Sequence, residues 1–148
     1  MDNNKHQIVL ADDDADDCMF FQDALDELPV SVSVTIVNDG VELMRYLTLN
    51  SDNLPDLLFL DLNMPRKTGF ECLTEIKEDE KLKQLPVIIY STSLDVEVLN
   101  VVYERGAFGY IRKPGDYTQL KKVIHEAILV SMQRATAQPA REAFVLQP

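Results

Sequence analysis

The chain contains only two cysteines, Cys18 and Cys72, and no apolar run that approaches the length of a membrane span. Two cysteines cannot build the disulfide framework of a small secreted domain, and both lie in apolar stretches, so we predict reduced core residues. A spanning helix needs about 20 apolar residues, which predicts no membrane partner. The first residues, MDNNKHQ, lack the apolar segment of a secretory signal, which predicts a cytoplasmic location.

Basic residues are also scarce, with 14 Lys and Arg against 25 Asp and Glu, for a net charge of −11. Nucleic-acid binding depends on Lys and Arg contacts with phosphates, so we predict no nucleic-acid partner. A phosphate-binding loop of the G-x-x-x-x-G-K type is missing, which argues against a nucleotide site of that class. Residues 1–64 carry 14 acidic and 2 basic side chains, and the acidic run at 12–17 directly follows an apolar segment. This position indicates an acidic site.

Short apolar runs alternate along the chain with segments of helical periodicity. The runs are rich in Val, Ile and Leu, which is typical of strands buried on both faces. One helical segment opens with Thr68-Gly69-Phe70-Glu71, a capping-box pattern, and another ends at Gly106, where a left-handed cap is expected. The predicted strands are 8–11, 32–37, 57–60, 87–90 and 108–111, and the helical segments lie near 18–28, 41–49, 68–76, 95–105 and 116–128.

Strands that alternate with helices predict an α/β fold with a parallel sheet covered on both faces. Right-handed crossovers leave few strand orders, and the common one for five strands is 2-1-3-4-5, the flavodoxin-like order. We therefore predict one doubly wound domain over residues 1–132. Residues 133–148 are expected to be a tail without an effector domain, either a mobile terminus or a docking segment.

Polar side chains follow four of the predicted strands at their carboxyl ends, where open parallel sheets bind ligands. Asp12 and Asp13 follow the first strand, Asp61 the third, Ser91 the fourth and Lys113 the fifth. The first and third strands would be neighbours about 4.8 Å apart, so three carboxylates should converge. Converging carboxylates should raise a pKa or recruit a cation, and oxygen-only ligands suit Mg²⁺. A lysine and a hydroxyl beside them suit a phosphoryl group, with a carboxylate as the nucleophile.

For each aspartate taken alone, a second interpretation is open. Loop aspartates are common helix N-caps, so Asp13 and Asp61 could cap the helices that follow them. Four strand ends that all supply the required chemistry favour the phosphoryl site.

Four motifs stand in a fixed order over about residues 6–131: IVLADDD at 8–14, LFLDLNMP at 58–65 with Gly69, PVIIYS at 86–91 and GAFGYIRKP at 106–114. With this set the chain resembles the receiver domain of bacterial two-component response regulators. The spacing is most similar to stand-alone receivers associated with bacterial phytochromes.

The resemblance implies a Mg²⁺ site. Asp13 would bind the metal directly and Asp12 mainly through water. Asp61 and the backbone carbonyl of Asn63 would complete the protein ligands.

The resemblance also implies that Asp61 accepts a phosphoryl group from a histidine kinase or phosphotransfer protein. Ser91 would hydrogen-bond the phosphoryl oxygens and Lys113 would pair with them. The Lys113–Pro114 peptide is cis in the family, so a cis bond is expected here. Gly115 stands where many receivers have Phe, so that contact is either missing or supplied by Tyr117.

Signalling in the family implies that Ser91 moves toward the phosphate and that Tyr110 rotates into the space left behind. The output surface would be the fourth helix, the fifth strand and the fifth helix, facing an unidentified downstream protein. Receivers commonly pair through this face. We predict a homodimer that uses it or the apolar tail residues Phe144, Val145 and Leu146; the alternative is that the tail folds back on its own domain. The residues expected to line the output face are Val98, Val102, Tyr103, Tyr110 and Lys121.

Two other function classes share part of this pattern. A phosphatase of the haloacid dehalogenase type also uses an aspartyl nucleophile and Mg²⁺, but it needs a second acid where this chain has Asn63. A degenerate receiver that acts only as a scaffold would not need the complete site. We therefore expect a phosphoacceptor that promotes only its own phosphoryl transfer and autodephosphorylation, and not an enzyme.

Overall fold

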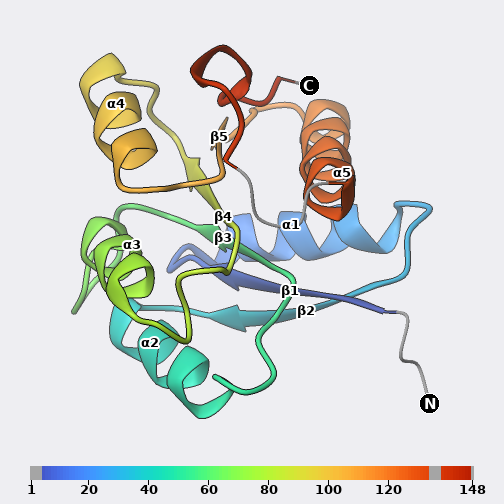
Figure 1. Ribbon diagram of the computed structural model, residues 1–148. Coiled ribbons are helices and arrows are strands. Elements are labelled where there is room, and N and C mark those ends of the chain that lie inside the picture. The colour runs from blue at the N-terminus through green and yellow to red at the C-terminus, as the bar shows by residue number, and fades with distance from the viewer. Residues whose placement is uncertain (1–4, 134–137, 148) are drawn as a thin grey trace.

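The structure is a computed structural model that describes residues 5–133 and 138–147 (Figure 1). Five parallel strands form one sheet in the order β2-β1-β3-β4-β5, which confirms the predicted order. The strands are β1 His6–Ala11, β2 Val32–Val37, β3 Leu57–Leu60, β4 Val87–Ser91 and β5 Gly109–Arg112. The helices are α1 Ala15–Asp26, α2 Gly40–Leu49, α3 Gly69–Glu78, α4 Val96–Glu104 and α5 Tyr117–Gln133, and a short 3₁₀ helix, η1, covers Arg141–Ala143.

Helices cover both faces of the sheet: α1 and α5 lie on one side, and α2, α3 and α4 on the other (Figure 1). The central strand β3 is buried throughout, and its side chains alternate between the two sides. Leu57 and Phe59 pack with α1 and α5, whereas Leu58 and Leu60 pack with α2, α3 and α4. This alternation explains why the strand is apolar at every position.

Local signals in the sequence set the ends of several helices. Thr68 and Glu71 form the predicted capping box at the start of α3. Gly106 follows α4 with φ +99°, a conformation that favours glycine because it has no Cβ. Asp116 accepts the backbone N–H of Gln119 at 3.1 Å, as expected where α5 begins.

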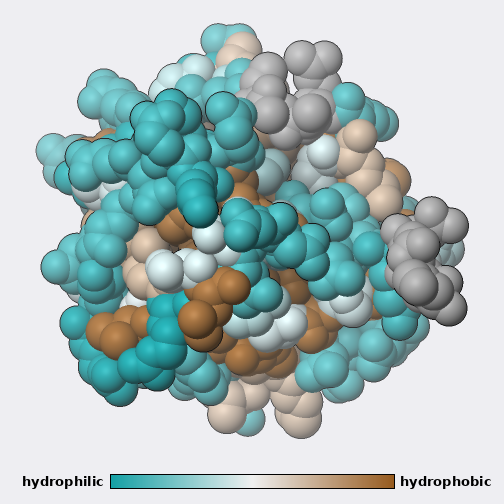
Figure 2. All heavy atoms as spheres, turned by 60° about the horizontal axis from the view of Figure 1, so that its bottom comes forward, coloured by the Kyte–Doolittle hydropathy of each residue, from teal (hydrophilic) through white to brown (hydrophobic). Residues whose placement is uncertain are grey.

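The two cysteines are free and buried, one on each side of the sheet, as predicted. The face of the molecule in Figure 2 is mainly hydrophilic, with small apolar patches between polar side chains. Over residues 5–133 and 138–147, no helix has the length and apolarity needed to cross a membrane.

The chain end from 138 to 147 packs on its own domain, beside β5 and α4 (Figure 1, red). Phe144 is completely buried, and Val145 makes a parallel bridge to Tyr110. Of the two arrangements open for the apolar tail, the intramolecular one is therefore present. The remaining tail residues, 134–137 and 148, lie outside the described residues.

Candidate functional site

Strand register brings the acidic residues together at the carboxyl edge of the sheet. Ala11 of β1 pairs with Leu60 of β3, so Asp12 and Asp61 leave neighbouring strands at the same level. The backbone N–H of Asp61 donates to the Ala11 carbonyl at 3.0 Å. Carboxylate oxygens of Asp12, Asp13 and Asp61 all lie within 4.8 Å of one another. Asp12 and Asp61 are buried, whereas Asp13 is exposed.

Neither Asp13 nor Asp61 caps a helix, which removes the second interpretation of these residues. Asp14 is the N-cap of α1 and Thr68 is the N-cap of α3. The Asp61 carboxylate instead accepts the backbone N–H of Asn63 at 3.2 Å within its own loop.

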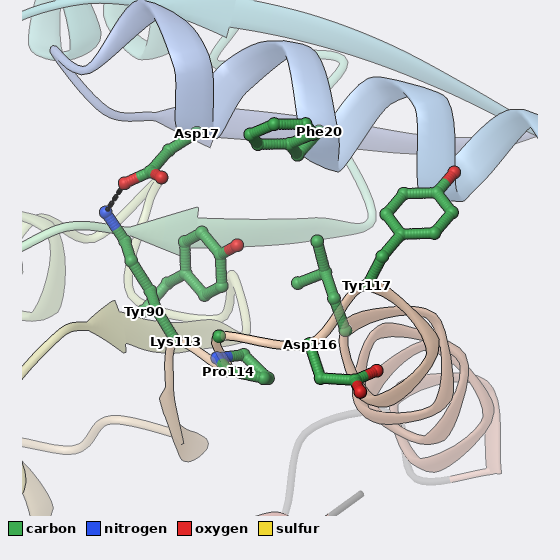
Figure 3. Close-up of a pocket in the computed structure, with 9 residues that line it drawn as sticks. Asp17, Phe20, Tyr90, Lys113, Pro114, Asp116 and Tyr117 are labelled. Carbon is green, nitrogen blue, oxygen red and sulfur yellow. Dashed lines mark hydrogen bonds and ion pairs between the residues drawn. The ribbon is translucent and has the colours of Figure 1, made fainter.

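Lys113 supplies the positive charge of the site. Its Nζ lies 2.8 Å from Asp12 Oδ2, 2.8 Å from Asp17 Oδ2 and 3.6 Å from Asp61 Oδ2. The ammonium also lies 5.0 Å from the ring centre of Tyr90, a cation–π contact. Figure 3 shows the lysine reaching up to Asp17 with Tyr90 beside it. One ammonium therefore faces three carboxylates, and a fourth, that of Asp13, lies within 4.8 Å of those of Asp12 and Asp61.

The sequence reasoning missed Asp17. It stands in the first turn of α1, where a side chain can reach back over the edge of the sheet. Its place in the acidic run was the available signal, but the run alone does not say which of its members turns toward the fifth strand.

The expected cis peptide at Lys113–Pro114 is wrong, since all described peptide bonds are trans. The backbone N–H of Lys113 donates to the Ser91 carbonyl at 2.7 Å and so continues the pairing of β5 with β4. This pairing already directs the lysine toward the site, and trans is the intrinsically favoured form of an X–Pro bond.

The position after Pro114 opens a small cavity between α1 and α5, with a volume of about 120 Å³ (Figure 3). Gly115 leaves space there, and Tyr117 forms one wall. The Tyr117 hydroxyl donates to Glu27, the C-cap residue of α1, at 2.8 Å, which fixes the ring. Of the two alternatives expected for the missing Phe, a lost contact or a contact from Tyr117, the structure has the second: Tyr117 supplies a wall of the cavity.

The pKa of Asp61 is raised to about 6, mainly because burial disfavours its charged form; the Asn63 N–H and Lys113 lower the pKa, and Asp12 adds to the rise. Burial alone would lower the pKa of Lys113, but its hydrogen bonds to Asp12 and Asp17 raise it above the usual range. The site thus has an excess of negative charge. Its donors are all oxygens, which fits a hard divalent cation such as Mg²⁺.

Ser91 and Tyr110 are linked through Ser93. Ser91 is buried at the end of β4, and its Oγ accepts the Ser93 N–H at 3.3 Å. The Tyr110 hydroxyl donates to the Ser93 carbonyl at 2.6 Å. A short chain of contacts therefore runs from the site to the ring on β5.

Three residues expected on the output face are placed elsewhere. Val102 and Tyr110 are completely buried, because their side chains fill the space between the sheet and α4. Lys121 pairs with Glu27, the C-cap residue of α1, at 2.9 Å and so faces the end of α1. Val98 and Tyr103 stay partly exposed on α4, and Lys121 is partly exposed as well, although it is paired with Glu27.

A sequence model of the response regulator receiver domain matches residues 8–125. The chain belongs to the response regulator receiver domain family. Response regulator Rcp1 of Synechocystis is 31% identical over 121 residues, which cover 79% of this chain and 82% of Rcp1. The probable methanogenesis regulatory protein FilR2 of Methanothrix harundinacea is 30% identical over 122 residues, or 80% of this chain and 79% of that protein.

Solved receivers share the fold. The phosphorylated cyanobacterial phytochrome response regulator RcpA matches with a TM-score of 0.77 and 35% identity over 92% of this chain and 99% of RcpA. The Mn²⁺-bound form of Rcp1 matches with a TM-score of 0.74 and 29% identity over 91% of this chain and 99% of that one. These relatives confirm the resemblance to phytochrome-associated receivers. Receiver domains are in general non-enzymatic phosphoacceptors of two-component systems, with an acidic pocket that binds Mg²⁺ or Mn²⁺.

Proposed function

We propose that this receiver accepts a phosphoryl group on Asp61 from a histidine kinase or phosphotransfer protein, in a Mg²⁺-dependent reaction within the cytoplasm. The observation that carries the proposal is the position of Asp61. Its carboxylate ends the central strand, within 4.8 Å of those of Asp12 and Asp13 and 3.6 Å from the Lys113 ammonium.

Asp12, Asp13, Asp61 and the backbone carbonyl of Asn63 would hold the metal. When bound, Mg²⁺ would offset negative charge on the phosphoryl oxygens. The oxygen-only donors and the excess of carboxylates over ammonium groups support this assignment.

In the transfer, an Asp61 oxygen attacks phosphorus, and the P–N bond of the donor phosphohistidine breaks. The electron pair of that bond returns to the imidazole nitrogen, and the ring leaves as neutral imidazole because its other nitrogen carries a proton. Lys113 pairs with a phosphoryl oxygen and stabilises charge there. The pKa of Asp61, raised to about 6, still leaves the carboxylate ionised at neutral pH and available as a nucleophile. A water in line with the acyl phosphate would later hydrolyse it, which is autodephosphorylation.

The same group would drive the signal. The Ser91 hydroxyl would turn from Ser93 toward a phosphoryl oxygen, and the loop that holds the Tyr110 hydroxyl would move with it. Output would pass through contacts of a downstream protein with α4, β5 and α5. A homodimer through this face stays a prediction, and it has to accommodate residues 138–147, which already cover part of the face.

The test is intact mass after incubation with acetyl phosphate, in Mg²⁺ and in EDTA. We expect one phosphate adduct that requires Mg²⁺ and is strongly reduced in Asp13→Ala. Asp23→Asn, an exposed carboxylate on α1, is the matched control and should behave like the parent. A scaffold would give no adduct, and a phosphatase would turn over p-nitrophenyl phosphate many times per molecule. Either result would contradict the proposal.

A further inference from the structure

Residues 138–147 bind the α4–β5 edge in the manner of a peptide ligand (Figure 1). β5 is the last strand of the sheet, so its outer edge offers backbone groups for pairing. Tyr110 uses both of its backbone groups there. Its N–H donates to the Phe144 carbonyl at 3.0 Å, and its carbonyl accepts the Leu146 N–H at 2.9 Å.

One aromatic side chain anchors the segment. Phe144 is completely buried, and its ring centre lies 5.0 Å from that of Tyr103, edge to face, and 6.5 Å from that of Tyr110. Val145 and Leu146 then pack on opposite sides of the sheet, as successive residues of an added strand do. The segment therefore fills both an edge and a pocket.

Polar contacts fix the direction of the segment. The Gln138 amide donates to the carbonyls of Tyr103 and Ala107 at 2.8 and 2.7 Å, and the Tyr103 hydroxyl donates to the Pro139 carbonyl at 3.1 Å. Arg141 donates to Asn100 Oδ1 at 3.1 and 3.3 Å. These contacts come from α4 and from the turn that follows it, so α4 and β5 together form the groove.

We propose that the α4–β5 edge is a peptide-binding groove whose ligand in this chain is its own segment 138–147. A partner that uses this face has to displace the segment with an extended stretch that runs parallel to β5 and carries an aromatic side chain for the Phe144 pocket. The contacts of Tyr110, Phe144 and Gln138 are the evidence that the segment occupies the groove. Only the role of the face in output rests on the proposed function.

A tethered segment has an effective concentration on the order of millimolar, so free peptide should compete poorly with it. The experiment therefore uses full-length Phe144→Ala, in which the internal ligand has lost its anchor. The probe is a fluorescent peptide with the sequence of residues 138–147, QPAREAFVLQ. We expect it to bind Phe144→Ala at least about tenfold more tightly than the parent. Glu142→Ala, a change at an exposed position of the same segment, should bind the probe as weakly as the parent.

A second variant guards against misfolding of the first. Leu146→Pro keeps the Phe144 side chain in the sequence but removes the N–H that donates to the Tyr110 carbonyl. The segment should therefore be held more weakly and leave the groove more often. In both variants the Tyr110 N–H should lose protection from hydrogen exchange. A probe in which Ala replaces Phe should bind neither variant.

Two results would overturn the proposal. One is a probe that fails to bind both folded variants. The other is a parent chain that is a dimer by light scattering and becomes a monomer on Phe144→Ala, because the segment would then lie on a second copy. The phosphate adduct on the parent is measured separately, so failure of the groove and failure of the phosphoacceptor site are distinguishable.

Discussion

The Lys113 ammonium lies 3.6 Å from Asp61 Oδ2, farther than its 2.8 Å ion pairs with Asp12 and Asp17. The lysine thus lies near the proposed phosphoacceptor, but its short hydrogen bonds go to Asp12 and Asp17. A phosphoryl group on Asp61 would extend into this gap and bring new oxygens within reach of the ammonium.

Removal of this lysine should therefore slow the transfer. We predict that Lys113→Ala lowers the rate of Asp61 phosphorylation by acetyl phosphate by about 10- to 100-fold at saturating Mg²⁺, because a charge that stabilises the transferring group is lost. Lys121→Ala is the matched control, since Lys121 of α5 is also ion-paired, to Glu27 at the end of α1, and lies over the ring of Tyr117, but makes none of the Lys113 contacts with Asp12, Asp17 and Asp61. Equal rates in Lys113→Ala and the parent would contradict the role of Lys113.

The stability of the metal-free protein should depend on Asp61. Burial raises the pKa of Asp61 from 3.8 to about 6, so between these values the native state holds more protons than the unfolded state. The free energy of unfolding therefore falls as pH rises from about 4 to 6 and stays lower above that. We predict that Asp61→Asn is more stable than the parent by about 1–3 kcal/mol at pH 7.5, and equal to it near pH 4.

Urea unfolding in EDTA at both pH values measures this difference. Asp23→Asn is the control and should be neutral at pH 7.5, because this carboxylate is exposed. A variant that is stabilised equally at pH 4 and pH 7.5 would show that the effect is not ionisation of Asp61.

The loop after Asp61 stores backbone strain. Arg66 has φ +70°, a left-handed conformation that costs an L-residue about 1–2 kcal/mol. Arg66→Gly relieves this cost, while Arg66→Ala keeps the Cβ and loses the same exposed ion pair with Asp39. We expect the glycine variant to be about 1 kcal/mol more stable than the alanine variant in thermal or urea unfolding. Equal stabilities would mean that the loop relaxes without the left-handed residue.

The signal should pass through the Ser91 hydroxyl. Ser91→Ala should still accept phosphate on Asp61, but the change in amide exchange along α4 and β5 should be largely lost. In Ser93→Ala the response should remain, because Tyr110 bonds the Ser93 backbone carbonyl and not its side chain. A full response in phosphorylated Ser91→Ala would exclude the proposed coupling.

The sequence predicted the sheet and the residues at its strand ends because these depend on local patterns. Continuous apolar runs such as Leu57–Leu60 indicate strands buried on both faces, and the capping box at Thr68 indicates a helix start. In a parallel sheet, such patterns bring the ends of β1 and β3 to one edge whatever the details of packing.

Features that depend on tertiary contacts were missed or misplaced. The apolar residues around Phe144 predict burial but not its location, because hydrophobic attraction is not directional. Asp17 accepts a hydrogen bond from Lys113, which lies 96 positions further along the chain, and no local pattern specifies that pairing. Val102 was expected at the surface, yet it is buried. Which side chains of α4 face the sheet depends on how the helix packs, and the sequence of one or two turns does not specify this.

The most direct test of the phosphoacceptor assignment is to locate the acyl phosphate chemically. After phosphorylation with acetyl phosphate and Mg²⁺, borohydride reduction converts an aspartyl phosphate to homoserine, and peptide sequencing by mass spectrometry identifies the position. We predict homoserine at 61 in the parent and none at any aspartate in Asp61→Asn. Homoserine at Asp12 or Asp13 in the parent, or an undiminished phosphate adduct in Asp61→Asn, would contradict the assignment.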